Sequence, residues 1–307
     1  MPRTNRDFNK SRRAKDNEYY TLYKDVADEV GLYLSQLQGM RILCPCDWAS
    51  SYNEQTFYTH EQGIITEPAP DGSQFIRYLV AKAEQYGFES ITASGYDDRT
   101  GVGIRFQDID YSKYDVIITN PPFSLFGEFI DTLIKADKKF LVIGSHMDGS
   151  LKNIVHYFQA GQIRIGYHYH LSGFLRPDGT ILSKQESTPR CCQWFTNLDV
   201  DLRQRPLVLT ESYEETPENY PKYINYDAIE VGAIRKIPSD YYALMGVPIT
   251  FWQAFNPEQF EIIGESNDLA IPFRDEKGKL CSGRFYTKSE DGTLHRHQPR
   301  LIIKRKQ

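Results

Sequence analysis

The sequence predicts an α/β protein with a mostly parallel central sheet and helices on both of its faces, followed by a smaller C-terminal α+β portion. Over the first half of the chain, short apolar runs alternate with segments whose apolar residues recur at helical spacing. This alternation implies parallel strands joined by right-handed crossovers. Beyond residue 200 the chain is rich in Pro, Tyr and charge, with few long helical patterns. We therefore expect a core over residues 1–200, which begins with a basic arm, and a separate portion over residues 201–307.

Three helices follow from the spacing of apolar residues and from the residues that end them. Residues 22–38 carry apolar side chains at helical spacing and stop at Gly39. Residues 74–86 form a second amphipathic pattern, which Gly87 closes. Residues 125–136 form a third.

Short apolar runs between these helices predict the strands of the sheet. They lie at residues 41–44, 91–93, 104–106, 115–119, 140–144, 163–167 and 192–196. Residues 50–72 are polar and rich in turn-forming residues, which favours a loop, and residues 1–16 are expected to form a flexible basic arm. The polar residues of interest follow directly after strands, where parallel sheets bind their ligands.

The overall charge limits how this chain could meet nucleic acid. The chain has 307 residues, a net charge of −5 and a pI near 5.9. That balance argues against a protein that coats nucleic acid non-specifically, although a local basic face is enough for a DNA enzyme. Both ends of the chain are basic. The sequence leaves open whether they contact the phosphates of a nucleic acid or are simply solvated tails.

The cysteines and the hydropathy point to a cytoplasmic protein. The chain has five cysteines and no apolar N-terminal signal, which favours reduced thiols. No stretch reaches the roughly 18 apolar residues that span a bilayer, so we expect no membrane segment. Cys44-Pro-Cys46 has the wrong spacing for a zinc knuckle, and we expect no metal site. We also expect a monomer.

The segment Asn120-Pro121-Pro122-Phe123 comes directly after the strand at 115–119 and carries the clearest chemistry. The side-chain oxygen of Asn120 and the backbone carbonyl of Pro121 can accept hydrogen bonds from the two N–H groups of a planar amino group. Pro122 stiffens the turn, and the ring of Phe123 offers a surface on which a base can stack. Such a turn acts by positioning and electrostatics, without a metal or a covalent intermediate.

This motif alone does not show which molecule carries the amino group that the turn would hold. The same turn suits the amino group of adenine in DNA, the amide of a protein glutamine or the amino group of guanine in RNA, since each is a planar nitrogen. The simpler interpretation is a rigid strand-to-helix turn whose Phe123 belongs to the core.

The rest of the chain resembles the EcoRI-type adenine-specific DNA methyltransferase family over nearly its whole length. The likeness rests on residues 15–25 (KDNEYYTLYKD), 41–47 (RILCPCD), 91–97 (ITASGYD), 115–123 (DVIITNPPF), 194–198 (WFTNL) and 245–264 (MGVPITFWQAFNPEQFEIIG). The resemblance implies a Rossmann-like methyltransferase fold, S-adenosylmethionine as cofactor and double-stranded DNA as partner. It makes residues 201–307 the target-recognition portion.

The resemblance also implies cofactor contacts. Tyr20 and Thr21 would contact the methionine end of S-adenosylmethionine, and Asp47, after Cys46, would lie near its amino group. Asp108 is similar to the acid that meets the cofactor's adenine. Carboxylates suit these places because the cofactor offers an ammonium group and N–H donors.

Two features depart from the usual pattern of this fold. Cys-Pro-Cys-Asp stands where a Gly-rich loop is common. Ser94 and Gly95 stand where an acid commonly holds the ribose, which leaves Asp97 as a shifted candidate.

Trp194 and Phe195 resemble the aromatic element that holds the flipped base. Neighbouring strand residues face opposite ways, so only one of them is expected to face the pocket, and the sequence leaves open which one.

The sequence therefore predicts a site-specific DNA adenine-N6 methyltransferase of a restriction-modification or phage-protection system. One alternative is an RNA or protein amino-group methyltransferase that uses the same turn. Another, of a different class, is a catalytically inactive DNA-binding decoy.

Overall fold

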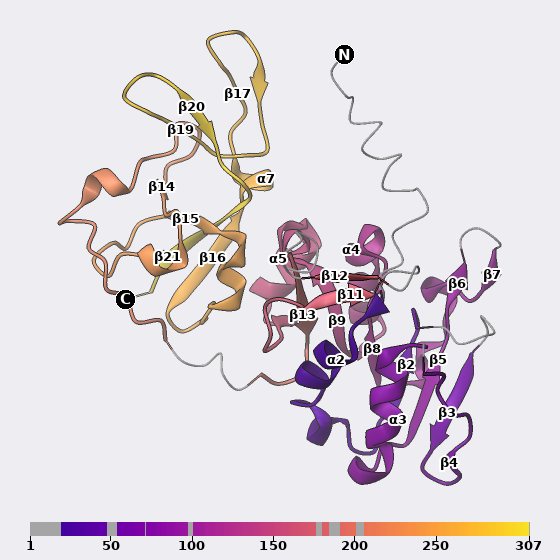
Figure 1. The fold of residues 1–307 in the computed structure, drawn as a ribbon. Coiled ribbons are helices and arrows are strands. Elements are labelled where there is room, and N and C mark those ends of the chain that lie inside the picture. The colour runs from indigo at the N-terminus through magenta and orange to yellow at the C-terminus, as the bar shows by residue number, and fades with distance from the viewer. Residues whose placement is uncertain are drawn as a thin grey trace. The chain divides into compact units, whose positions relative to one another are not determined.

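The computed structural model describes residues 20–47, 54–70, 72–97, 101–175, 180–183, 191–200 and 206–306. The predicted basic arm at 1–16 lies outside these residues. The chain divides into two compact units, one of Met1–Gly144 with Gly166–Leu198 and one of Ser145–Ile165 with Asp199–Gln307 (Figure 1). The segment 145–165, which the sequence groups with the core, therefore belongs to the second unit.

A large mixed sheet forms the centre of the first unit. Within this unit, its strands lie in the order β13 (Cys192–Thr196), β9 (Lys139–Ser145), β8 (Val116–Thr119), β2 (Arg41–Cys44), β5 (Ser90–Ala93), β3 (Gln55–Thr59) and β4 (Gly63–Ile64). β2 pairs in parallel with β5 and β8, and β8 pairs in parallel with β9. β3 is antiparallel to both β4 and β5. The predicted α/β class is confirmed, and its sheet is mixed.

The strand order reverses at β2, because later strands are added on the opposite side of β2 from the earlier ones. The chain goes from β2 to β5 on one side and later to β8 on the other. Since both neighbours are parallel to β2, the carboxyl ends of all three strands meet at one edge. Ligands of open α/β sheets bind at such a switch point.

Helices cover both faces of this sheet. α3 (Gln74–Tyr86) contacts Trp194 of β13 through Phe75, with ring centroids 5.9 Å apart. α4 (Phe126–Lys135) contacts Phe195 through Phe126, with centroids 4.9 Å apart. Because neighbouring residues of a strand point to opposite faces, α3 and α4 lie on opposite sides of the sheet.

The predicted helices at 74–86 and 125–136 are confirmed, with small shifts at the ends of the second. Gly87 adopts the left-handed conformation that ends α3, with φ +64°. The predicted helix at 22–38 is shorter: α2 (Tyr23–Val30) ends at Gly31, and a 3₁₀ turn, η1 (Leu34–Leu37), follows.

Two predicted segments are wrong in part. Residues 50–72 include a hairpin, β3–β4, rather than only a loop. A bulge between Thr56 and Tyr58 interrupts the alternation, so that Phe57 and Tyr58 are both buried and the strand shows no two-residue pattern. The strand predicted at 104–106 is also absent, because η2 (Phe106–Asp108) begins there and the short β6–β7 hairpin lies before it.

The second unit has its own sheet, in the order β14 (Ile229–Glu230), β15 (Met245–Pro248), β21 (Arg300–Arg305) and β16 (Phe260–Glu265). Two separate hairpins join β17 (Phe273–Arg274) to β18 (Leu280–Cys281) and β19 (Tyr286–Lys288) to β20 (Leu294–Arg296). The α-helices in the described part of this unit are α5 (Lys152–Gln159) and α7 (Ser266–Leu269), and a short strand, β10 (Arg164–Ile165), follows α5.

The core of the second unit explains why residues 145–165 belong to it. Phe158 of α5 stacks on Trp252 with ring centroids 4.1 Å apart. The indole Nε1 of Trp252 donates to the backbone oxygen of Gly149 at 2.9 Å. Among the described residues, no helix is long and apolar enough to cross a membrane.

Candidate active site

The predicted catalytic turn lies at the carboxyl end of β8, on the edge where the parallel strands meet. Pro121 is buried, Pro122 is exposed, and Asn120 and Phe123 are half-buried. The backbone oxygen of Pro122 accepts from the N–H of Leu125 at 3.0 Å, which starts η4 (Phe123–Leu125) and leads into α4. The turn is thus held between a buried strand and a packed helix.

Asp47 connects this turn to the end of β2. Its Oδ2 accepts a hydrogen bond from the hydroxyl of Thr119, the residue before Asn120, at 2.5 Å. Its Oδ1 accepts from the hydroxyl of Ser73 at 2.7 Å. Ser73 is also the N-cap of α3, where its side chain accepts from the N–H of Ile76. One carboxyl group therefore joins the ends of β2 and β8 to the start of a helix.

The surroundings of Asp47 favour its neutral form. Burial raises the pKa of its carboxyl to about 6, against the hydrogen bonds from Thr119, from Ser73 and from the backbone of Asn120, which lower it. A carboxyl group that titrates near neutrality at a ligand-binding edge is a candidate functional group.

Cys46 and the segment of Asp108 lie together beside Asp47. Burial raises the pKa of the Cys46 thiol, and Asp47 raises it further, so the thiol stays protonated. Burial also raises the pKa of the nearby Tyr111, whose hydroxyl donates to the backbone oxygen of Phe106 at 2.9 Å. Asp108 follows Phe106 in η2 and is exposed.

The end of β5 places a buried hydroxyl beside β2. The backbone N–H of Ser94 donates to the oxygen of Cys44 at 3.1 Å. The side-chain oxygen of Ser94 is buried and has no hydrogen-bond partner among the described residues. Asp97 lies three residues further on, half-buried in β6 (Tyr96–Asp97), which pairs with β7 (Val102–Gly103).

Tyr20 and Thr21 reach the catalytic turn through a small second sheet. They form β1, which pairs with β11 (Gly173–Leu175), and β11 pairs with β12 (Ile181–Ser183). Thr21 lies opposite Phe174, and the Phe174 ring packs edge-on against Phe123 with centroids 6.5 Å apart. Within the described part of the chain, the buried hydroxyl oxygen of Thr21 has no hydrogen-bond partner.

The side chains of Trp194 and Phe195 lie on opposite faces of β13. Phe195 packs on Phe126, and an added Cβ at Gly144 would lie 2.9 Å from its ring. Trp194 faces the other side of β13, where it lines a cavity together with residues of α2 and of the segment 168–172. Phe195 is therefore a core residue on the α4 side, and Trp194 is the one that borders a cavity.

The sequence-predicted residues thus divide into groups. Asp47, Cys46 and Asn120–Phe123 meet at the ends of β2 and β8, while Tyr20 and Thr21 join them through Phe174. Asp97, Asp108 and Trp194 lie on neighbouring elements, namely β6, η2 and β13. Among the residues described, no group of three or more His, Cys, Asp or Glu could hold a metal ion.

Three residues of this site were not predicted from the sequence, namely Ser73, Thr119 and Phe174. The sequence could have indicated Thr119 and Ser73, because Thr119 directly precedes the predicted catalytic turn and Ser73 directly precedes a predicted helix. The sequence gives no such indication for Phe174, because it is an apolar residue 51 positions from Phe123.

Comparisons with known proteins agree on one family. The model of the family described as "Adenine-specific methyltransferase EcoRI" matches residues 7–63 and 106–306. The chain is 33% identical to "Type II methyltransferase M.EcoRI" of Escherichia coli over 307 residues, which covers 87% of this chain and 93% of that protein. It is 29% identical to "Type II methyltransferase M.MpnI" of Mycoplasma pneumoniae over 330 residues, with 98% of each chain covered. No solved structure matches significantly.

Proposed function

The chain belongs to the EcoRI family of adenine-specific methyltransferases, and we propose that it methylates the N6 amino group of adenine at specific sites in double-stranded DNA. The proposal includes a Rossmann-like core and a role in restriction-modification or phage protection. Relatives named Type II methyltransferases support that role.

The hydrogen bond from Thr119 to Asp47, 2.5 Å long, is the observation that carries this proposal. It joins the turn after β2, where the cofactor is expected, to the turn after β8, where the amino group is expected. A methyl donor and an acceptor would therefore meet at one edge of the sheet, as a direct transfer requires.

S-adenosylmethionine is the methyl donor we propose, and it would supply a sulfonium-bound methyl group. The chain offers it donors and acceptors of the right kinds. The buried hydroxyl oxygens of Thr21 and Ser94 lack partners among the described residues, and buried polar atoms are rarely left so. The Asp47 carboxyl suits the ammonium group of the cofactor, and the exposed Asp108 suits N–H donors on its adenine.

The catalytic turn would act on the acceptor nitrogen. The Asn120 side-chain oxygen and the Pro121 carbonyl would accept its two N–H bonds and draw the nitrogen lone pair out of conjugation with the ring. Phe123 would stack on the adenine, and Phe174, packed against Phe123, widens the aromatic surface that receives it. Such a surface offsets part of the cost of flipping the base out of the duplex.

Supplying methyl-labelled S-adenosylmethionine together with DNA, RNA and a protein extract tests the choice of acceptor. We expect label in DNA, because the family is adenine-specific. Label confined to RNA or protein would show that the turn serves another planar nitrogen. Tight DNA binding without label in any polymer would show an inactive decoy.

The pKa of Asp47 predicts how cofactor affinity depends on pH. An ammonium group pairs with a carboxylate and not with a neutral carboxyl, so affinity should fall about tenfold per pH unit below pH 6 and level off above it. Titration calorimetry between pH 5 and 8 measures this. Asp47→Asn should bind weakly at every pH, and a wild-type affinity that is flat across pH 6 would exclude Asp47 from the ammonium site.

Stability should change in the opposite sense in the cofactor-free protein. Since burial raises the folded-state pKa of Asp47, the stability that this group contributes is present at low pH and is lost as the pH rises through about 6. Denaturant titration of the cofactor-free protein across pH 6 measures this loss of stability. Asp47→Asn should not show it, which separates the effect of Asp47 on stability from its effect on cofactor affinity.

The C-terminal unit would read the DNA through its two hairpins. Arg274 of β17 and Arg296 of β20 are exposed, as are Lys279 and Lys288. Phe273 packs edge-on against Tyr286 at 5.2 Å and joins the hairpins to each other. A two-stranded ribbon fits the major groove of B-DNA.

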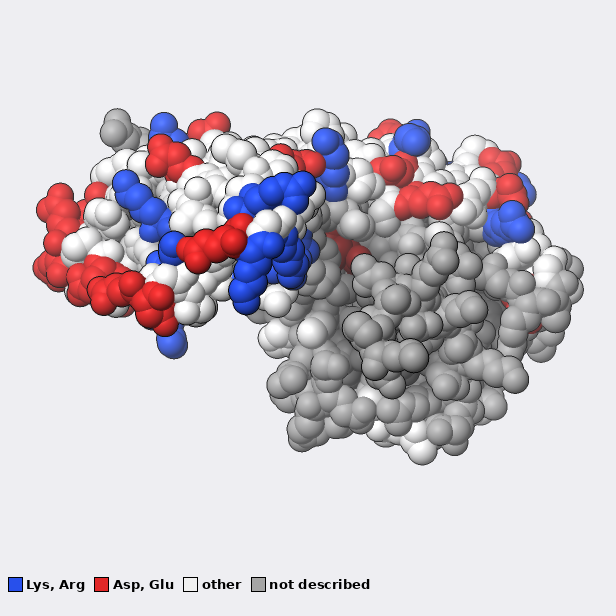
Figure 2. Space-filling model, turned by 90° about the horizontal axis from the view of Figure 1, so that it is seen from above, with Lys and Arg blue, Asp and Glu red and all other residues white. Residues whose placement is uncertain are grey.

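A close pair of arginines supports this assignment. Burial lowers the pKa of Arg284, Glu265 raises it, and the neighbouring Arg296 lowers it. Two guanidinium groups that repel each other are relieved by an anion such as a DNA phosphate. On the face seen from above, several Lys and Arg side chains lie close together beside acidic ones, and others lie apart from them (Figure 2).

Replacing Arg274 and Arg296 together with glutamine should weaken DNA binding and reduce its dependence on salt. The slope of log affinity against log salt should drop by about 0.9 for each lost phosphate contact. Lys135→Gln at the end of α4, an exposed lysine outside the hairpins, is the matched control. An unchanged slope in the double variant would remove the hairpins from the DNA interface.

A further inference from the structure

Two carboxylates of α2 hold a distant segment of the chain, residues 167–173. Asp25 and Glu29 lie one helical turn apart and face the same way. Both are buried: Asp25 is 7% exposed and Glu29 is 0% exposed. Buried carboxylates need hydrogen bonds, and here these come from the backbone of a segment about 140 residues away.

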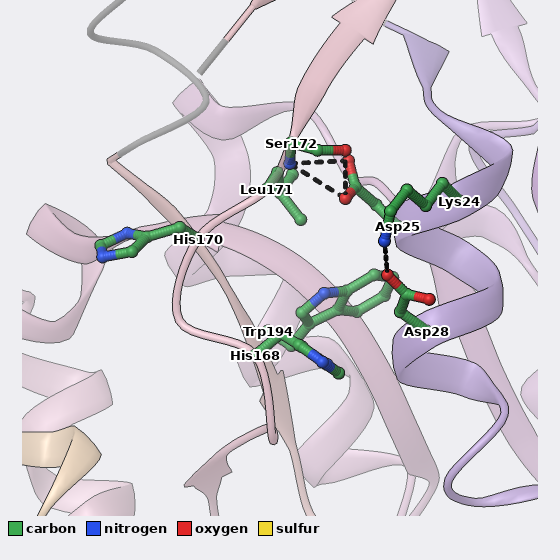
Figure 3. A pocket seen from close by; sticks show the side chains of 8 residues that line it. All are labelled: Lys24, Asp25, Asp28, His168, His170, Leu171, Ser172 and Trp194. Atoms are coloured by element: carbon green, nitrogen blue, oxygen red, sulfur yellow. Dashed lines mark hydrogen bonds and ion pairs between the residues drawn. The ribbon is translucent and has the colours of Figure 1, made fainter. Parts of the chain in front are cut away.

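Asp25 holds the end of this segment. Both of its oxygens accept from the N–H of Ser172, at 2.9 and 3.0 Å, and Oδ1 also accepts from the Ser172 hydroxyl at 2.6 Å (Figure 3). Its Oδ2 accepts from the N–H of Gly173 at 3.4 Å. Gly173 is the first residue of β11.

Glu29 holds the start of the segment. It accepts from the N–H groups of Tyr167 and His168, at 2.7 and 2.8 Å, and contacts the His168 ring at 2.7 Å. The Tyr33 hydroxyl donates to it at 2.8 Å. The hydrogen bond from the His168 ring to Glu29 raises the pKa of His168, so a positive charge on the ring is favoured beside the carboxylate.

These contacts link β1, α2, residues 167–173 and β11 into a closed frame beside the catalytic turn. β1 leads directly into α2, α2 holds residues 167–173, and these lead into β11, which pairs back with β1. The frame carries Thr21 on one strand and Phe174 on the other, and Phe174 packs on Phe123 of the catalytic turn. The hydrogen bonds of both carboxylates go to residues 167–173 and to Tyr33, so any effect on that turn passes through the frame.

We propose that Asp25 and Glu29 are positioning residues for methyl transfer, which set Phe174 against Phe123 through the segment 167–173. This inference rests on the proposed function. A displacement of about 1 Å at a reacting centre lowers a rate about a hundredfold. Loss of either carboxylate should therefore lower kcat about 10- to 100-fold and change the KM for DNA far less.

A double-mutant cycle on Glu29 and Phe174 tests the proposal, since these residues would act on the same step without acting independently. Glu29→Gln and Phe174→Leu are made singly and together in the full chain, and kcat is measured on DNA well below the unfolding temperature. If Glu29 acts through Phe174, the double variant loses little more than the worse single variant. Losses that multiply, or an unchanged kcat in Glu29→Gln, would overturn the proposal.

Two further variants keep the test decisive. Asp28→Asn, on the same helix and paired with the exposed Lys24, should keep kcat within about twofold. If Glu29→Gln does not fold, Ser172→Ala replaces it in the cycle, because it removes one hydrogen bond to Asp25 and leaves the backbone donors in place. If the wild-type protein transfers no label to DNA, the proposed function fails, whereas an active wild type with multiplying losses refutes only the positioning role.

Discussion

Asn120→Ala is expected to lower the rate of methyl transfer about a thousandfold or more. The variant keeps the backbone carbonyl of Pro121 but loses one of the two acceptors that would grip the amino group. With one acceptor, the nitrogen stays conjugated with its ring and is a poor nucleophile. Single-turnover transfer of labelled methyl groups to DNA measures this loss.

Cofactor affinity is the control for Asn120→Ala. The cofactor would meet Asp47, Thr21 and Ser94, so its dissociation constant should stay within about threefold of the wild-type value. The bond between Thr119 and Asp47 remains in the variant, which keeps both turns in place. A large loss of cofactor binding would show that Asn120 belongs to the cofactor site instead.

Gly166→Ala is expected to lower the free energy of unfolding by about 3 kcal/mol. An added Cβ would lie 2.1 Å from Oε1 of Glu29 and 2.7 Å from Cβ of Trp194. Glu29 has no simple way to retreat, since its oxygens hold Tyr167, His168 and Tyr33. The variant therefore loses buried hydrogen bonds as well as packing.

Denaturant titration of Gly166→Ala measures this effect, and Gly232→Ala is its matched control. Gly232 is exposed, and an added Cβ there would meet nothing within 4 Å, so its alanine variant should change stability by less than about 0.5 kcal/mol. If Gly166→Ala is as stable as the control, the close packing of β13, α2 and residue 166 is wrong.

The elements that were predicted well are those determined by local pattern. The helix at 74–86 has a clear apolar face, a serine before it and a glycine after it, and its bounds agree with α3. The position of Asn120–Phe123 at the end of a buried strand follows in the same way. Short-range chemistry is sufficient in both cases.

The elements that were missed depend on contacts between distant residues. β3 has a bulge that buries Phe57 beside Tyr58, so its sequence lacks alternation and looks like a loop. Phe174 packs on Phe123 and lies two residues after Ser172, which donates to Asp25 from 147 residues further along the chain. Pairings of this kind leave no periodic trace in the sequence.

The product released from methylated DNA tests the central claim most directly. DNA incubated with the enzyme and methyl-labelled S-adenosylmethionine is digested to nucleosides, and the labelled nucleoside is identified by mass spectrometry. The account predicts N6-methyl-deoxyadenosine from the wild-type protein and almost none from Asn120→Ala. Label on another atom or another base, or equal label from both proteins, would contradict it.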